Sequence, residues 1–179
     1  MGDLVKEGKI RYVGLSNETP WGLSEFIKAA EMHDLPKVVS VQNAYNLLNR
    51  IYESGMSEFH HRSQVGLLAY SPLAQGYLTG KYLDGARPAG ARTTLFERGQ
   101  RYETEQAEEI IRKYVNLANE YSMDPALMAN SFVNDQDFVT SNIIGATTME
   151  QLKIAVGSID TKLDEECLKK IEEIHYGCP

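Results

Sequence analysis

The chain has 179 residues, of which 42% are hydrophobic and 24% are charged, and its formal net charge is -7. This composition is ordinary for a soluble globular protein, and the negative charge argues against a nucleic-acid or anionic-membrane partner. No apolar run approaches the roughly 20 residues that a membrane span needs. Two cysteines, Cys167 and Cys178, do not make a disulfide scaffold, so we expect a reducing, cytoplasmic setting.

The predicted elements alternate between strands and helices along the chain. Short apolar runs that end in small polar residues indicate buried parallel strands, and amphipathic stretches behind a Ser, Thr or Asp cap indicate helices. The stretch Asp3–Gly8 is typical of a glycine-closed helix end, so the chain begins within an element already under way. The strands are expected at 11–15, 38–41, 66–70 and 142–144, and the helices after Thr19, over 54–63, after Thr104, after Asp124, after Thr148 and over 164–175.

Four strand–helix units in succession predict one parallel α/β domain over residues 1–179. Because a complete (β/α)8 TIM barrel typically has about 250 residues, four units account for half of such a barrel. A bare half-barrel has two unpaired edge strands and an inner face that we expect to be apolar. We therefore expect it to be unstable as a monomer unless something covers that face.

Polar or aromatic side chains stand at the carboxyl ends of all four predicted strands, namely Ser16-Asn17, Gln42-Asn43, Tyr70-Ser71 and Thr147-Thr148. Pro72 cannot continue a central strand, so the backbone must turn outward there. In parallel α/β folds this end of the sheet holds ligands, which predicts one shared site. The strand at 66–70 is expected to be buried on both faces, and Tyr70 either presents its ring at the mouth of the site or caps the core.

The long connection from Ala74 to Glu103 carries Gly76, Gly80, Gly85 and Gly90 with Lys81, Arg87 and Arg92. Connections of this length often act as lids or binding loops, and a flexible surface excursion with solvated charges is the alternative. Further along, Thr148-Met149-Glu150-Gln151 has the pattern of a capping box. The helix N-terminus that it opens suits a phosphate, and a well-capped helix without a ligand is the alternative.

Five ordered stretches resemble the aldo-keto reductases, and among them most closely the bacterial and plant branch related to potassium-channel β subunits. The stretches are Gly8-Lys9-Ile10-Arg11-Tyr12-Val13-Gly14-Leu15-Ser16-Asn17, Val41-Gln42-Asn43 with Leu47-Leu48-Asn49-Arg50, Tyr70-Ser71-Pro72-Leu73, Gly76-Tyr77-Leu78-Thr79-Gly80-Lys81-Tyr82, and Ile143-Ile144-Gly145-Ala146-Thr147-Thr148-Met149-Glu150-Gln151-Leu152. The resemblance runs nearly end to end and covers the C-terminal half of that family's fold, strands five to eight of a TIM barrel. It implies hydride transfer between NADPH and a carbonyl carbon.

The resemblance implies a role in NADPH binding for residues along the whole cofactor. The nicotinamide carboxamide would be hydrogen-bonded by Ser16, Asn17 and Gln42, and its ring would stack on Tyr70. The ribose and pyrophosphate path would be lined by Ser71, Pro72, Leu73 and Gly76. The phosphates would be clasped by Lys81 and Arg92, and the 2′-phosphate and adenosine would be held by Gly145, Thr147 and Gln151.

Two features depart from the family pattern. Ile154-Ala155 stand where the family usually carries the Glu-Asn pair that contacts adenine, which should weaken adenine recognition or marks drift after loss of selection. The family's catalytic Asp, Tyr, Lys and His lie on its first four strands and have no match here, and Lys81 and Tyr82 belong to the cofactor loop instead. No His, Cys and Glu spacing predicts a metal site.

Three interpretations follow from these observations. The chain is the NADPH-binding half of an oxidoreductase that acts only if another chain supplies the first four strands, or a non-enzymatic remnant or interaction module that pairs through the exposed half-barrel face. The third is self-pairing of two copies into a pseudo-complete barrel. Retained Gln42, Tyr70 and Gln151 favour a working cofactor site, whereas Ile154-Ala155 and the missing general acid favour a remnant. In each case we expect no meaningful carbonyl reduction by these residues alone.

Overall fold

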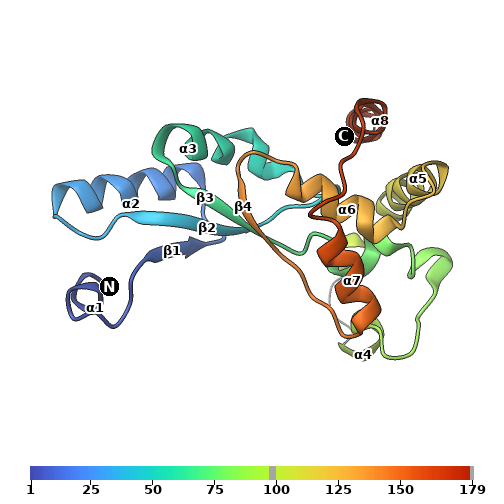
Figure 1. The fold of residues 1–179 in the computed structure, drawn as a ribbon, viewed down its shortest axis with the longest axis horizontal. Helices are drawn as coiled ribbons and strands as arrows, with labels where there is room; N and C mark the ends of the chain where they lie inside the picture. Colours follow the sequence, from blue (N-terminus) through green and yellow to red (C-terminus); the bar gives the residue numbers. More distant parts are fainter. Residues whose placement is uncertain (97–99, 178–179) are drawn as a thin grey trace.

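The computed structural model describes residues 1–96 and 100–177 as one four-stranded parallel sheet with helices packed along it (Figure 1). Cys178 lies outside the described residues. The strands are β1 (Val13–Ser16), β2 (Val38–Ala44), β3 (Gly66–Tyr70) and β4 (Val139–Ile143). The helices are α1 (Gly2–Lys6), α2 (Pro20–Met32), α3 (Met56–Ser63), α4 (Arg92–Phe96), α5 (Glu105–Glu120), α6 (Pro125–Asn134), α7 (Met149–Gly157) and α8 (Glu165–Tyr176), with 3-10 helices η1 (Ile51–Ser54), η2 (Ala74–Thr79), η3 (Leu83–Gly85) and η4 (Gln100–Tyr102).

The strand order β1-β2-β3-β4 follows the chain, and every neighbouring pair is parallel, which confirms the predicted α/β half-barrel architecture. The bounds of β2 and β4 differ from the expectation. β2 continues through Ala44, because its last residues pair with Ala69 and Tyr70 of β3. β4 begins at Val139 and ends at Ile143, so it includes the polar stretch Thr140-Ser141-Asn142, whose strand conformation comes from pairing with β3.

The outer face of the sheet carries the hydrophobic core. Leu15, Val41, Leu67 and Val139 lie side by side across the four strands, and Val41 and Leu67 are fully buried. Helices α2 and α3 lie along one side of the sheet, and α5, α6 and α8 gather beyond β4 (Figure 1). Side chains from all of these helices join one continuous core with the strands, which fits a single domain.

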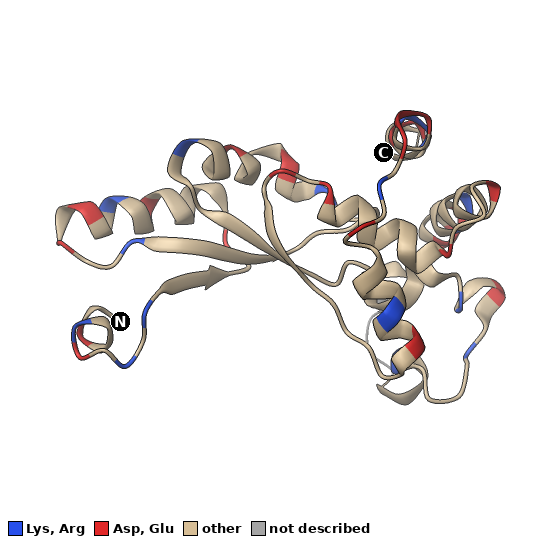
Figure 2. Cartoon of the chain, in the orientation of Figure 1, with Lys and Arg blue, Asp and Glu red and all other residues tan. Residues whose placement is uncertain are grey.

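The inner face differs from the apolar surface expected of it. Its rows across the sheet consist largely of small and polar side chains, namely Gly14, Ser40 and Gly66, then Ser16, Gln42, Leu68 and Ser141, then Ala44, Tyr70 and Ile143. β3 is therefore not buried on both faces, because Leu68 and Tyr70 on this side are only half-buried. The strands carry no charged residue, and Lys, Arg, Asp and Glu lie on helices and connections (Figure 2).

Exposed apolar side chains gather on helices instead. On α7, Met149, Val156 and Ile159 just beyond its end are 67%, 55% and 66% exposed, and on α2 Trp21 is 74% exposed. These side chains have large apolar areas that water contacts directly, which is unfavourable for an isolated chain. The most exposed apolar side chains are thus on helical faces rather than on the inside of the half-barrel.

The long connection after β3 is folded rather than extended into solvent. Tyr77 and Tyr82 are buried, and the Tyr77 hydroxyl donates to Glu103 Oε1 over 2.5 Å. Arg87 Nη2 donates to the same carboxylate oxygen over 3.0 Å. Burial, together with the hydrogen bond to Glu103, raises the pKa of Tyr77. These contacts fix the two ends of the connection to one another.

Arg50 ties α8 to the region that follows β2. Its guanidinium pairs with Glu53 over 2.6 Å and with Glu172 on α8 over 2.7 Å, and it lies 5.3 Å from the Phe132 ring centre. Burial by itself would lower the pKa of Arg50, and the two carboxylates raise it by more. Because a bidentate, partly buried Arg pair is stronger than an exposed one, this cluster fixes the position of α8.

Candidate functional site

The carboxyl ends of β1, β2 and β3 bring together the side chains predicted for the nicotinamide end. The backbone N–H of Asn17 donates to the Gln42 carbonyl over 3.0 Å, and Ser16 Oγ donates to the same oxygen over 3.3 Å. The Tyr70 hydroxyl donates to Asn17 Oδ1 over 2.7 Å. Ser16, Asn17, Gln42 and Tyr70 therefore form one cluster, which we call the strand-end cluster.

Tyr70 belongs to the inner face of the sheet, between Ala44 and Ile143 in the same row. The hydrophobic core lies on the opposite face, so Tyr70 does not cap it. The ring is half-buried and its hydroxyl is held by Asn17. An aromatic face in this position, with amide groups beside it, suits a flat heteroaromatic ring that carries a carboxamide.

The turn after β3 holds several residues in the left-handed backbone region. Ser71, Ala74 and Gln75 have φ of 57°, 47° and 62°, and Gly76 has φ of 98°. Such conformations are costly for residues other than glycine and persist where neighbours fix them. The fully buried Asn46 fixes this turn, because its Nδ2 donates to the Ser71 carbonyl over 2.9 Å. Pro72 and Leu73 lie in this turn, with Pro72 buried and Leu73 half-buried.

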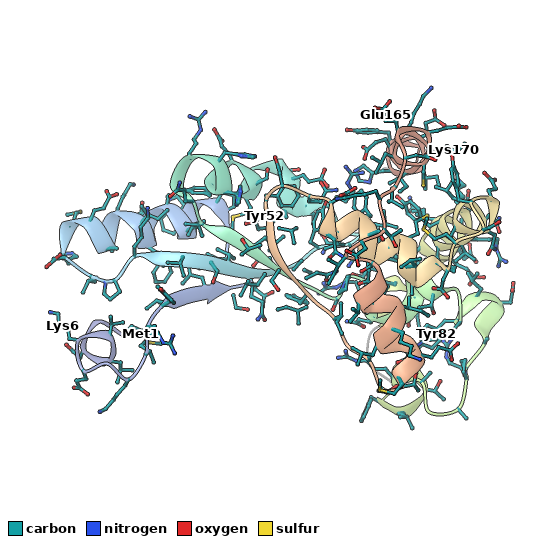
Figure 3. All side chains as sticks on the ribbon, viewed as in Figure 1. Met1, Lys6, Tyr52, Tyr82, Glu165 and Lys170 are labelled. Atoms are coloured by element: carbon teal, nitrogen blue, oxygen red, sulfur yellow. The ribbon has the colours of Figure 1, made fainter. Side chains whose placement is uncertain are left out.

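Lys81 lies directly against Gly76. A Cβ at Gly76 would stand 3.0 Å from Lys81 Nζ and 2.9 Å from its Cε, and the φ of 98° favours glycine at this position. Lys81 Nζ is also 5.2 Å from the centre of the Tyr82 ring, which Figure 3 labels in the helical part of the molecule. The Tyr82 hydroxyl accepts from the Thr93 backbone N–H over 3.3 Å, and Thr93 follows Arg92, the exposed first residue of α4.

Tyr82 titrates differently from the other buried tyrosines for which a shift is resolved. Burial by itself would raise the pKa of Tyr82, but the hydrogen bonds from Thr93 and the positive charge of Lys81 lower it by more. The pKa values of Tyr45, Tyr52 and Tyr77 are raised, with burial as the largest cause. The positive charge of Lys81 beside Gly76 is therefore one of the causes, after the hydrogen bonds from Thr93, that lower the pKa of Tyr82.

The segment at the start of α7 holds the residues predicted for the adenosine end. Thr148 caps the helix, since its Oγ accepts from the Gln151 N–H over 3.2 Å. The Gln151 side chain returns to Thr147, where Oε1 accepts from the backbone N–H over 2.9 Å. Gly145 precedes them with open space around it, and all four residues are exposed. No hydrogen bond within the described residues joins this segment to the strand-end cluster.

The two family departures, Ile154 and Ala155, follow Gln151 on α7 by three and four residues. Ala155 is 9% exposed and Ile154 is half-buried. The Ala155 side chain is therefore packed within the fold rather than in solvent. Weaker adenine recognition through these two residues remains a prediction.

A buried amide network that the sequence reasoning missed connects β4, α6 and α7. Asn142 Nδ2 donates to Asn130 Oδ1 over 3.2 Å and to Asn134 Oδ1 over 3.0 Å. Asn134 Nδ2 in turn donates to Ser158 Oγ at the end of α7 over 2.9 Å. Asn142 Oδ1 is buried and has no partner within the described part of the chain. The only available signal was the asparagine pair, Asn130 and Asn134, within the otherwise largely apolar helix α6.

Two surface hollows lie away from the predicted site residues. One is lined by Val39, His60, His61, Gln64, Gly66 and Thr140 at the amino ends of the strands, and the other lies between α5 and α8. Within residues 1–96 and 100–177, no group of three or more His, Cys, Asp or Glu is arranged to hold a metal ion. No helix in these two described ranges has both the length and the apolar character to cross a membrane.

Comparison with known proteins gives a consistent result along the chain. The model of the Aldo/keto reductase family matches residues 1–175. The chain is 49% identical over 175 residues to Protein tas of Escherichia coli (strain K12), covering 98% of this chain and 51% of that protein. It is 38% identical over 156 residues to an aldo-keto reductase of Babesia bovis (84% and 55%) and 34% over 164 residues to L-glyceraldehyde 3-phosphate reductase of Escherichia coli (strain K12) (87% and 46%). The chain thus spans about half the length of these curated relatives.

Proposed function

Because the chain belongs to the aldo/keto reductase family, we propose that its strand-end edge binds NADP(H) and forms the cofactor-binding half of an oxidoreductase. The reaction we propose for the assembled protein is reduction of an aldehyde or ketone carbonyl. The observation that carries this proposal is the strand-end cluster, in which Asn17, Gln42 and Tyr70 converge from three neighbouring strands. When bound, NADPH supplies the hydride, and this chain supplies its binding surface.

The strand-end cluster supports recognition of the nicotinamide end. A carboxamide ligand needs both donors and acceptors, and Gln42 offers both from an exposed side chain. Asn17 accepts from Tyr70 through Oδ1, and its Nδ2 lies 3.4 Å from Ser16 Oγ, a long contact that leaves the second N–H to a ligand. Tyr70 contributes the ring face on which an aromatic heterocycle stacks.

The phosphate end is supported by charge and by free backbone donors. Lys81 lies against Gly76 and Arg92 is exposed at the start of α4, so both cations belong to the folded connection that follows the strand-end cluster. The N-terminus of α7 adds N–H groups and the positive end of a helix dipole beside Thr147 and Gln151. A polyanionic dinucleotide matches this distribution of charge, since the strands themselves carry none.

We further propose that these 179 residues alone do not reduce carbonyls. Carbonyl reduction needs a general acid beside the carbonyl oxygen. The Tyr70 hydroxyl already donates a hydrogen bond to Asn17 Oδ1. The Tyr82 hydroxyl accepts a hydrogen bond from the Thr93 N–H within the folded connection. The exposed apolar faces of α2 and α7 favour covering by a complementing chain or by a second copy. Pairing of this kind without catalysis is the second candidate function.

Titration of the purified chain by calorimetry tests the proposal, with NADPH as the ligand and NADH as its control. We expect saturable binding of NADPH that is tighter than binding of NADH, because the cations and α7 recognise the additional phosphate. Sedimentation of the same sample reports whether the chain is a monomer. Absence of binding at millimolar NADPH would overturn the oxidoreductase proposal and leave pairing as the function to test.

A further inference from the structure

We propose that Asn43 is a positioning residue for the nicotinamide end, because its side-chain amide holds both backbone groups of Glu18 and thereby fixes the conformation of Asn17. This inference rests on the proposed function, since it concerns how the strand-end cluster is held in place. Asn43 itself lies on β2 and its side chain belongs to the outer row with Ala69 and Asn142. It therefore acts through Glu18 and Asn17 without facing the cofactor.

The geometry is a reciprocal pair of hydrogen bonds beyond the end of β1. The β1–β2 register ends where Ser16 pairs with Gln42. Past this point the Glu18 N–H donates to Asn43 Oδ1 over 3.1 Å, and Asn43 Nδ2 donates to the Glu18 carbonyl over 3.0 Å. An asparagine amide presents an acceptor and a donor side by side, as a peptide group does. The side chain thus replaces the strand residue that would have paired with Glu18.

Asn17 needs this support because its backbone is in an uncommon conformation. Its φ of 53° lies in the left-handed region, which costs roughly 1 kcal/mol for most residues and less for asparagine. The conformation also sets the direction of its side chain, whose Oδ1 accepts from Tyr70. If the turn relaxed, the Asn17 amide would leave Tyr70 and the carboxamide-binding groups would separate.

The Glu18 carboxylate provides a second anchor for the same turn. Its Oε1 accepts from the Thr19 N–H over 2.8 Å at the N-terminus of α2, where a negative charge is favourable. A Cβ at Gly22 would stand 2.0 Å from this oxygen, so a side chain there would displace the Glu18 carboxylate from its present position. Backbone and side chain of Glu18 are therefore both held, and Asn17 lies next to them.

The test compares Asn43→Leu with a matched control, Asn134→Leu. Both wild-type side chains are half-buried amides with two hydrogen bonds, but Asn134 belongs to the network under α7. The first readout is the affinity for NADPH divided by that for adenosine 2′,5′-bisphosphate, which lacks the nicotinamide. We expect Asn43→Leu to lower this ratio roughly tenfold and Asn134→Leu to leave it within about twofold.

The second readout needs no cofactor. Amide hydrogen exchange at Asn17 and Glu18 should speed up at least roughly tenfold in Asn43→Leu, with Leu67 in β3 unchanged. Asn43→Asp keeps the acceptor for the Glu18 N–H but sets a carboxylate oxygen against the Glu18 carbonyl, so exchange should speed up in this variant as well. Unchanged exchange at Asn17 in Asn43→Leu, or an equal fall of the affinity ratio in both leucine variants, would overturn the positioning role. If the wild-type chain binds no NADPH but exchange still responds, the proposed function fails while the structural coupling stands.

Discussion

The two ends of the proposed cofactor path are built in different ways. At the nicotinamide end, Asn17, Gln42 and Tyr70 are bonded to one another and stand on adjacent strands. At the adenosine end, Thr147 and Gln151 are bonded only within their own short segment, and they are exposed. The first end is held by the sheet itself, and the second depends on where α7 lies.

What holds α7 is mainly polar. Ala155 and Ser158 are its buried contacts, and Ser158 receives hydrogen bonds from the amide network that begins at Asn142. Its apolar side chains, among them Met149 and Val156, are exposed. The proposed nicotinamide end is thus preorganised by strand pairing, whereas the proposed adenosine end is positioned by a few buried amides. Four substitutions test this difference.

Asn142→Asp should produce the largest effect, a destabilisation of about 3 kcal/mol at pH 7. The introduced carboxylate would face the Oδ1 atoms of Asn130 and Asn134, which are both acceptors. This environment raises the pKa of the new carboxyl in the folded state, so the deficit is small in acid, where the group is protonated, and grows as the pH rises. Urea unfolding of variant and wild type at pH 4 and pH 7 measures it. Asn142→Thr, which keeps a donor, is the control, and a deficit independent of pH would contradict the network.

Tyr70→Ala should weaken NADPH binding roughly 30-fold, about 2 kcal/mol, through loss of the ring face and of the hydroxyl that holds Asn17. NADH should weaken by the same factor, because the nicotinamide ends of the two cofactors are identical. Tyr70→Phe keeps the ring and should lose only about fivefold. Calorimetric titrations of the two variants decide the matter, and equal losses in both would show that the ring face contributes nothing.

Gln151→Ala should weaken NADPH binding roughly tenfold and leave NADH within about twofold. The side chain lies at the start of α7 and orients Thr147 through its Oε1, so its loss affects only the end that carries the additional phosphate. Thr148→Ala removes the helix cap and is expected to cost about 1 kcal/mol of folding stability. If Gln151→Ala weakened both cofactors equally, the assignment of this segment to the 2′-phosphate would be wrong.

Tyr52→Phe should give the smallest effect, a stabilisation of about 1 kcal/mol at pH 7, since the Tyr52 hydroxyl is buried without a partner in the described chain. Tyr52, labelled in Figure 3, packs on Phe138 with ring centres 5.5 Å apart, and both residues belong to the hydrophobic core. Burial raises the pKa of Tyr52 from 10.0 to about 12. Ionisation of Tyr52 therefore leaves the free energy of unfolding unchanged below pH 10 and lowers it as the pH rises toward 12, because the buried phenol holds its proton more tightly than the unfolded chain does.

Thermal unfolding of wild type and Tyr52→Phe between pH 9 and pH 12 measures this difference. The variant should lose less stability over that range, and its affinity for NADPH at pH 7 should equal that of the wild type. A change in NADPH affinity in this variant would contradict the expectation, because it would show that packing in the core alters the proposed cofactor site.

The elements that local chemistry specifies were predictable from the sequence. The caps at Thr19, Thr104, Asp124, Thr148 and Asp164 each bind the backbone of the following turn, because a cap involves only neighbouring residues. The parallel order of the strands followed from the alternation of strands and helices. The polar residues that end β1, β2 and β3 also come together as expected, since parallel strands place equivalent ends at one edge.

The features that depend on strand pairing and on contacts between distant residues were less predictable from the sequence. The central residues of β4, Thr140-Ser141-Asn142, are polar, and only contact with β3 makes them part of a strand. The small and polar inner face could not be foreseen, because register decides which side each residue faces and a shift of one residue reverses it. The amide networks around Asn43, Asn46 and Asn142 join residues far apart in the chain, so no local pattern marks them.

The sequence by itself determined the family, the succession of elements and the residue types offered to a dinucleotide, because these depend on local spacing and on ordered motifs. The tertiary structure alone decided that Asn17 meets Tyr70, that Lys81 lies against Gly76, and that α7 is held through Ser158. These contacts form only after strand register and helix packing are set. Hydrogen bonds between distant residues take their geometry from the fold, whereas caps and strand ends take theirs from adjacent residues.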